Sequence, residues 1–188
     1  MSEASDAQGE VATFLTHYFC GRPFQSLMAL TPAERAEVLA AGHVPNAARY
    51  ADPDYVRTRQ RVEDELRTGF EARGGRAQVR FPFYALLGRS QAVERRSPER
   101  VGVQLALAAV PGDAASFTFF DSFCLDPQFR RARGIEHPAV GEVHLLTELN
   151  SQLERWAGIP WSRPLWMEIE VQLWFRPDGL TWPEPSAS

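Results

Sequence analysis

The chain has 188 residues, a hydrophobic fraction of 44% and a formal net charge of −4. This size and composition favour one folded domain with a real core and argue against intrinsic disorder. The negative charge argues against nucleic acid as the main partner, because phosphate binding rests on a basic surface. No apolar run approaches the roughly 20 residues of a membrane-spanning helix, so we expect no membrane association.

All 20 basic residues are arginine, and mechanisms that need a catalytic lysine or a P-loop lysine are therefore excluded. Cys20 and Cys124 are too far apart for a CxxC motif, and residues 1–10 lack the basic and apolar regions of a secretory signal. These features predict buried, reduced thiols in a cytoplasmic protein. We expect one domain over residues 11–176, flanked by an N-terminal tail (1–10) and an irregular C-terminal tail (177–188).

The first half of the chain predicts two strands and two helices. The β-branched and aromatic run 11–19 is typical of a strand. Thr31, Pro32 and Glu34 form the pattern of a capping box, which predicts a helix that ends at Gly42. A second helix should begin at Pro53, and Gly74-Gly75 should end it. The apolar stripe of this helix comprises Val62, Leu66 and Phe70. A strand should follow over residues 77–87.

The second half predicts one helix and four strands. Thr147 is a candidate cap for a helix that places Leu149, Leu153 and Trp156 inward and ends at Gly158. Residues 127–138 are expected to form an arginine-rich loop. The predicted strands cover residues 101–107, 116–125, 140–146 and 165–175.

About six strands and three helices, without regular βαβ alternation, predict an α+β fold. We expect a curved, mostly antiparallel sheet.

The last predicted strand contains the best candidates for chemistry. Alternation places Glu168, Glu170 and Gln172 on one face, with Trp166 and Trp174 at its two ends. One interpretation is a half-exposed sheet face whose acids are solvated. The other is a ligand cleft, because two tryptophans make the face partly apolar.

Other candidate residues lie on the earlier strands. Ser116 and Thr118 place small hydroxyl groups at alternate positions of one strand, and Tyr84 is a further ligand-binding candidate. His17 precedes Cys20 by three residues, but the four histidines are scattered, and we predict no metal site. The sequence has no GxSxG elbow, no GxGxxG fingerprint and no Walker A motif.

Several segments resemble an uncharacterised family of bacterial proteins over most of the chain, from residue 14 to residue 174. These segments are FLTHYF, PFQSL, YVRTRQRVE…GFEARGG, FPFYALLG, SFTFFDSF, HPAVGEVHLL and EIEVQLW. That family has no assigned activity, so the resemblance implies no function.

The layout also resembles that of ADP-ribosyltransferases, which bind NAD across a split, curved sheet. Their sites combine a first-strand Arg or His, a middle-strand Ser-Thr-Ser or Tyr, and a late-strand Glu. Here His17, Ser116/Thr118 and Glu168/Glu170 occur in that order, although the middle element reads Ser-Phe-Thr. The resemblance implies that the late glutamate stabilises an oxocarbenium-like transition state.

Two functional hypotheses follow. The first is an enzyme that binds NAD, with Glu170 as the essential carboxylate, assisted by Glu168 and His17. The second is a non-catalytic module that binds a small molecule or a protein partner through Trp166 and Trp174.

Overall fold

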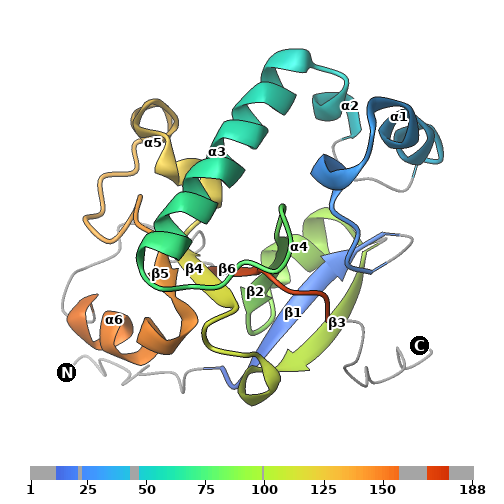
Figure 1. The fold of residues 1–188 in the computed structure, drawn as a ribbon. Helices are drawn as coiled ribbons and strands as arrows, with labels where there is room; N and C mark the ends of the chain where they lie inside the picture. The colour runs from blue at the N-terminus through green and yellow to red at the C-terminus, as the bar shows by residue number, and fades with distance from the viewer. Residues whose placement is uncertain (1–11, 21–22, 43–46, 99, 157–168, 178–188) are drawn as a thin grey trace, which may run out of the picture.

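The computed structural model describes residues 12–20, 23–42, 47–98, 100–156 and 169–177. These residues form a six-stranded sheet in the order β3-β1-β2-β6-β4-β5, and every neighbouring pair is antiparallel (Figure 1). The strands are β1 (Phe14–Phe19), β2 (Phe83–Leu87), β3 (Val101–Ala106), β4 (Ala115–Phe119), β5 (His144–Leu145) and β6 (Ile169–Leu173).

Helices complete the fold and confirm its α+β class. The α-helices in the described part of the chain are α1 (Pro32–Ala40), α2 (Ala47–Tyr50), α3 (Pro53–Ala72), α4 (Gln91–Arg96), α5 (Pro127–Arg133) and α6 (Leu149–Trp156). Short 3-10 helices cover Leu27–Ala29, Leu107–Ala109, Ser122–Leu125 and Leu146–Glu148. None of the described helices is long and apolar enough to cross a bilayer.

Helix α3 is the longest element, and its boundaries are those that the sequence predicts. The Asp52 side chain accepts a hydrogen bond from the Asp54 N–H at 2.9 Å, and Pro53 occupies the first helical turn. The helix ends just before Gly74, whose φ of +88° is a conformation that glycine adopts without a Cβ clash. The predicted stripe of Val62, Leu66 and Phe70 is fully buried. The capping box of α1 is also confirmed.

Helix α3 packs over the part of one sheet face that β4, β5 and β6 form (Figure 1). Trp174, which directly follows β6, is fully buried and stacks on Phe70 with the ring centroids 5.3 Å apart. Gln172 on the same face is also fully buried. This part of the face is therefore not half-exposed, because the apolar stripe of α3 packs against it, whereas Glu170 further along the strand is half-buried.

The opposite face of the sheet contributes to the larger apolar core. Leu15, Ala85, Phe117 and Val171 belong to this core, and Leu149 of α6 packs with them. Strand register fixes which side chains share a face, because paired residues of neighbouring strands point to the same side. Leu86 pairs with Glu170 and Ala85 with Val171, so Glu170 lies on the α3 face and Val171 on the core face.

Several predicted strands are shorter than the sequence indicates, and the strand predicted over residues 140–146 is reduced to His144–Leu145. Residues 77–82 precede β2 without joining the ladder, and the Gln78 and Val79 N–H groups both donate to the Trp174 carbonyl. The predicted strand 116–125 ends at Phe119, because Phe120 adopts a φ of +68° and turns the chain into the 3-10 helix at Ser122–Leu125.

The arginine-rich segment is a helix instead of the predicted loop. Asp126 caps α5, Pro127 occupies its first turn, and Gly134 ends it with a φ of +63°. The helix predicted from Thr147 begins at Leu149, after a 3-10 turn, and its predicted end at Gly158 lies outside the described residues. Neither cysteine forms a disulfide; Cys124 is buried as expected, whereas Cys20 is only half-buried.

Candidate functional site

A buried charged cluster lies where α3 meets the sheet. Arg59 is 9% exposed and Glu63 is 2% exposed, and the Arg59 Nε donates to Glu63 Oε1 at 2.8 Å. The Tyr84 hydroxyl of β2 donates to the same oxygen at 3.2 Å. The other carboxylate oxygen, Oε2, is buried and has no partner among the described residues. Burial raises the pKa of Glu63, and the Arg59 guanidinium opposes that shift.

Aromatic rings hold the Arg59 guanidinium in place. Its central carbon lies 4.2 Å from the centroid of the Tyr84 ring and 5.3 Å from that of the Phe123 ring. Such cation–π contacts are strongest where water is excluded. The Nη1 atom also lies 3.4 Å from the Ser122 hydroxyl oxygen, so Arg59 connects α3 with the segment that follows β4.

Glu170 of β6 approaches the same cluster. The Ser122 N–H donates to Glu170 Oε1 at 3.1 Å, and Asp121 caps the 3-10 helix beside it by accepting from the Phe123 N–H at 2.9 Å. Burial, reinforced by the negative charge of Asp121, raises the pKa of Glu170 to about 7. The Arg59 charge and the Ser122 hydrogen bond pull that pKa down but do not overcome burial.

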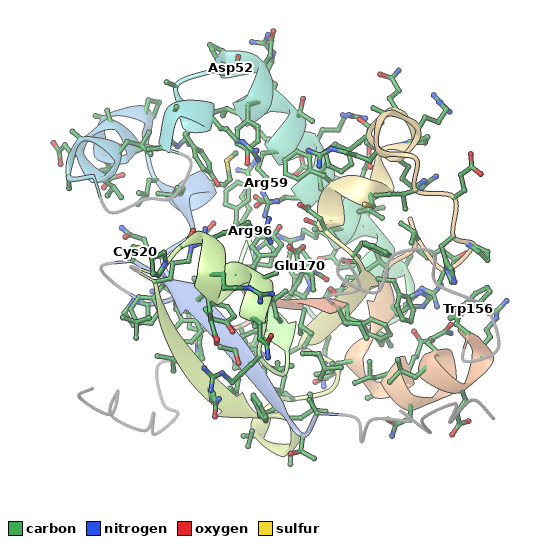
Figure 2. The ribbon with its side chains drawn as sticks, turned by 180° about the vertical axis from the view of Figure 1, so that it is seen from behind. Cys20, Asp52, Arg59, Arg96, Trp156 and Glu170 are labelled. Carbon is green, nitrogen blue, oxygen red and sulfur yellow. The ribbon has the colours of Figure 1, made fainter. Side chains whose placement is uncertain are left out.

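A pocket of about 800 Å³ opens onto Arg59 and Glu170. Figure 2 shows these two side chains near each other in the middle of the molecule, with Arg96 of α4 nearby and Asp52 at the start of α3. The volume lies within the usual range for small-molecule sites. Its wall combines aromatic rings with both signs of charge: Tyr55, Phe120, Phe123 and Phe129; Arg49, Arg59, Arg96 and Arg133; Asp52, Asp54, Asp121, Glu136 and Glu170.

The backbone of the pocket wall is strained at one position. Phe120 has a φ of +68°, a left-handed conformation that is unfavourable for a bulky residue. Its carbonyl accepts a hydrogen bond from the Thr118 hydroxyl at 3.0 Å, which helps to fix the turn. Strain of this kind often occurs where a chain must place functional groups. Here it directs Asp121 and the Ser122 N–H toward Glu170.

The predicted hydroxyl residues lie on the α3 face but inside the protein. Ser116 is fully buried, and its hydroxyl donates to Gln172 Oε1 at 2.9 Å and accepts from Trp174 Nε1 at 2.8 Å. Thr118 accepts from Gln172 Nε2 at 3.3 Å, and the same nitrogen lies 3.4 Å from Glu170 Oε1. Neither hydroxyl group lines the pocket. Both form hydrogen bonds to the Gln172 side chain, which in turn contacts Glu170.

His17 lies on the other face of the sheet. It pairs with Val103, and its ring stacks on Phe24 with the centroids 4.3 Å apart. The Phe24 N–H donates to Nε2 at 3.0 Å, so Nδ1 carries the proton and donates to the Tyr84 carbonyl at 2.7 Å. Burial lowers the pKa of His17. Both ring nitrogens are occupied, and the structure does not bring His17 together with Glu170.

Of the two candidate tryptophans, the structure describes only Trp174. Trp166 and Glu168 lie outside the described residues. Trp174 is fully buried beneath α3, where it cannot contact an external partner. Tyr84 contacts Glu63 and Arg59 of the cluster but is not among the residues that line the pocket.

Sequence reasoning missed Arg59 and Glu63, the two charged residues at the centre of the cluster. A signal was present, because both occur on the apolar stripe of α3: Arg59 precedes Val62 by three residues, and Glu63 precedes Leu66 by three. Charged residues on the buried face of a helix are uncommon unless they are paired.

The fold and the site define an α+β protein with a polar, aromatic pocket between its sheet and its longest helix. No model of a known protein family matches the chain, and no curated protein or solved structure shows significant similarity to it. In the described part of the chain, no three His, Cys, Asp or Glu side chains gather as a metal site would require.

Proposed function

We propose that the protein is an enzyme that binds a small molecule in this pocket and uses Glu170 as its essential carboxylate. The observation that carries the proposal is the position of Glu170, which lies at the wall of a pocket of about 800 Å³ beside the buried Arg59. A carboxyl group with a pKa of about 7 can both donate and accept a proton near neutral pH. Perturbed titratable groups in a pocket are typical of active sites.

We propose NAD⁺ as the first substrate to test. Its pyrophosphate suits the arginines of the pocket wall, and its two ring systems suit the aromatic wall. In ADP-ribosyl transfer, Glu170 would stabilise positive charge that develops on the nicotinamide ribose. His17 has no part in this version of the proposal, because it lies on the other face of the sheet.

The test is a calorimetric titration of NAD⁺ into the wild type, followed by an assay of nicotinamide release. We expect saturable binding, and turnover that falls about 100-fold or more in Glu170→Gln, the size of effect seen when a transition-state contact is removed. Glu154→Gln is the matched control, because Glu154 is exposed on α6 and does not line the pocket.

Three results would count against the proposal. An absence of heat with the wild type at millimolar NAD⁺ would exclude NAD⁺ as the ligand. Binding without turnover would show that the protein binds NAD⁺ but is not an enzyme that acts on it. Equal turnover in the wild type and Glu170→Gln would remove the catalytic role of Glu170.

A further inference from the structure

We propose that Arg59 is an anion-recognition residue and that the ligand of the pocket carries a carboxylate or phosphate group that binds to it. The inference rests on the proposed function only in that a ligand occupies this pocket. It adds the chemical class of that ligand and a binding residue beyond Glu170.

The first argument is the unused capacity of the Arg59 guanidinium. An arginine side chain has five N–H donors in a planar fork. Among the described residues, Arg59 uses Nε for Glu63 and Nη1 for Ser122, and Nη2 has no hydrogen-bond partner. Nη2 is not among the fully buried polar atoms without a partner, so it is accessible, and Arg59 lines the pocket. Donors therefore remain available on the pocket side.

The second argument is the cost of placing this group where it is. Arg59 is only 9% exposed. Burying a charge whose hydrogen bonding is incomplete has a high cost in free energy. Glu63 neutralises the charge through a single oxygen instead of a bidentate contact. A bidentate pair would have used two nitrogens of the fork. The one-sided contact leaves the opposite edge of the guanidinium for an anion.

The third argument is that the guanidinium is already held in one orientation. The rings of Tyr84 and Phe123 lie 4.2 Å and 5.3 Å from its central carbon, so little side-chain entropy remains to be lost on binding. A lysine could not stack on these rings in the same way. An anion that entered the pocket would therefore meet donors that are already oriented.

The fourth argument separates this site from a general basic surface. Arg49, Arg96 and Arg133 also line the pocket, but acids accompany them there, so the pocket as a whole is not strongly basic. Selectivity for an anion must therefore come from the local geometry at Arg59. Non-specific attraction, in contrast, would follow the net charge of the wall and would be screened by salt.

Glu170 adds a dependence on pH. Its carboxyl group faces Arg59 from α3, Asp121 and Cys124 from the segment after β4, and Tyr84 from β2. When Glu170 is ionised it repels a second anion and competes for the Arg59 charge. When it is protonated it can donate a hydrogen bond to that anion. Anion binding should therefore tighten as pH falls through the titration of Glu170.

The experiment compares two anionic probes with two neutral probes of similar shape. Benzoate is paired with benzamide, and phenyl phosphate with phenol; binding to the full chain is followed by NMR titration. We expect each anion to bind about tenfold tighter than its neutral partner, the effect of one charge-assisted contact. The anion that binds more tightly distinguishes a carboxylate ligand from a phosphate ligand.

Two substitutions at Arg59 and one matched control complete the design. Arg59→Lys keeps the charge but loses the fork, and Arg59→Gln loses both; each should remove most of the preference for anions. Arg67→Gln is the control, because Arg67 forms the same kind of bond to Glu71, at 2.9 Å, on the exposed side of α3. Its probe affinities should equal those of the wild type.

The wild type alone can decide the question if the Arg59 variants do not fold. Benzoate stays ionised between about pH 6 and pH 8, so tighter binding at the lower pH reports on the protein. That dependence should disappear in Glu170→Gln. Equal affinity for anions and neutral probes would overturn the inference and leave the pocket as a ligand site. Saturable binding by none of the four probes would overturn both the inference and the proposed pocket function.

Discussion

At the scale of single residues, Glu170 experiences opposing influences on its charge. Burial and the negative charge of Asp121 favour the neutral acid, whereas Arg59 and the Ser122 N–H favour the carboxylate. Burial dominates, so we expect Glu170 to titrate with a midpoint of about 7 instead of its ordinary 4.5. NMR of carbon-labelled glutamate side chains, assigned with Glu170→Gln, measures this midpoint directly.

Asp121→Asn tests how much the charge of Asp121 contributes to that shift. Asparagine removes the like charge but can still cap the 3-10 helix at Ser122, so the local fold should persist. The midpoint of Glu170 should then move down toward its ordinary value. A midpoint near 4.5 already in the wild type would show that Glu170 is well solvated, and it would remove the argument for proton transfer near neutral pH.

The sequence indicated Glu170 because strand alternation is a local property. It could not indicate that His17 and Glu170 lie on opposite faces, since that depends on how β1, β2 and β6 are paired. A shift of one residue in register reverses the face of every side chain in a strand. The order of His17, Ser116 and Glu170 along the chain, which suggested the comparison with ADP-ribosyltransferases, therefore does not place them in one site.

At the scale of elements, α3 contains two Arg–Glu pairs with the same spacing and different surroundings. Arg59–Glu63 is buried, whereas Arg67–Glu71 is exposed. Removing one partner of a buried pair leaves an uncompensated charge, so Glu63→Ala should cost roughly 3–5 kcal/mol of unfolding free energy. Glu71→Ala should cost less than about 1 kcal/mol, because water screens the exposed pair.

Urea unfolding of the two variants measures this difference in unfolding free energy, and the change in helix propensity is the same in both. Both substitutions replace glutamate by alanine inside the same helix, so intrinsic propensity changes equally. Equal losses would show that burial at Arg59 does not isolate its charge from solvent. That result would also weaken the case for a preorganised anion site.

Element boundaries were predictable wherever a cap, a proline and a glycine occur together, and α5 shows that the same signal can be overlooked. Asp52-Pro53 and Gly74 delimit α3, and Asp126-Pro127 and Gly134 delimit α5. The arginine run by itself is typical of a solvated loop, and the capping residues on either side of it make the segment a helix. The end of β4 is different, because nothing in the local sequence predicts a positive φ at a bulky residue such as Phe120.

At the scale of the whole molecule, the covering of the sheet by α3 decides what the last strand can do. The sequence placed Glu170, Gln172 and Trp174 on one face correctly. Which of these residues meet solvent depends on where α3 crosses the sheet, a contact between residues far apart in the chain. Gln172 and Trp174 lie under the apolar stripe of α3, and Glu170 lies beyond it at the pocket.

Between about pH 4.5 and pH 7, folding stability should depend on two sets of groups that act in opposite directions. Burial raises the pKa of Glu63 and Glu170, so the stability they contribute is present at low pH and is lost as pH rises through their folded-state titration, near 7 for Glu170. Burial lowers the pKa of His17 and His144, so the unfolded chain takes up their protons first. Stability therefore falls as pH drops below 6.5.

Two substitutions separate these opposing contributions. His144 is 1% exposed and neither ring nitrogen has a hydrogen-bond partner among the described residues, so protonation inside the fold is unfavourable. Phenylalanine can take its place on the Phe117 ring, 5.1 Å away, and His144→Phe should reduce the loss of stability below pH 6.5. Glu170→Gln should remove the loss that accompanies ionisation of Glu170 as pH rises from 4.5 through about 7. Urea midpoints from about pH 5 to pH 8 measure both, and a Glu170→Gln profile parallel to that of the wild type would mean that Glu170 is already ionised at little cost in the folded protein.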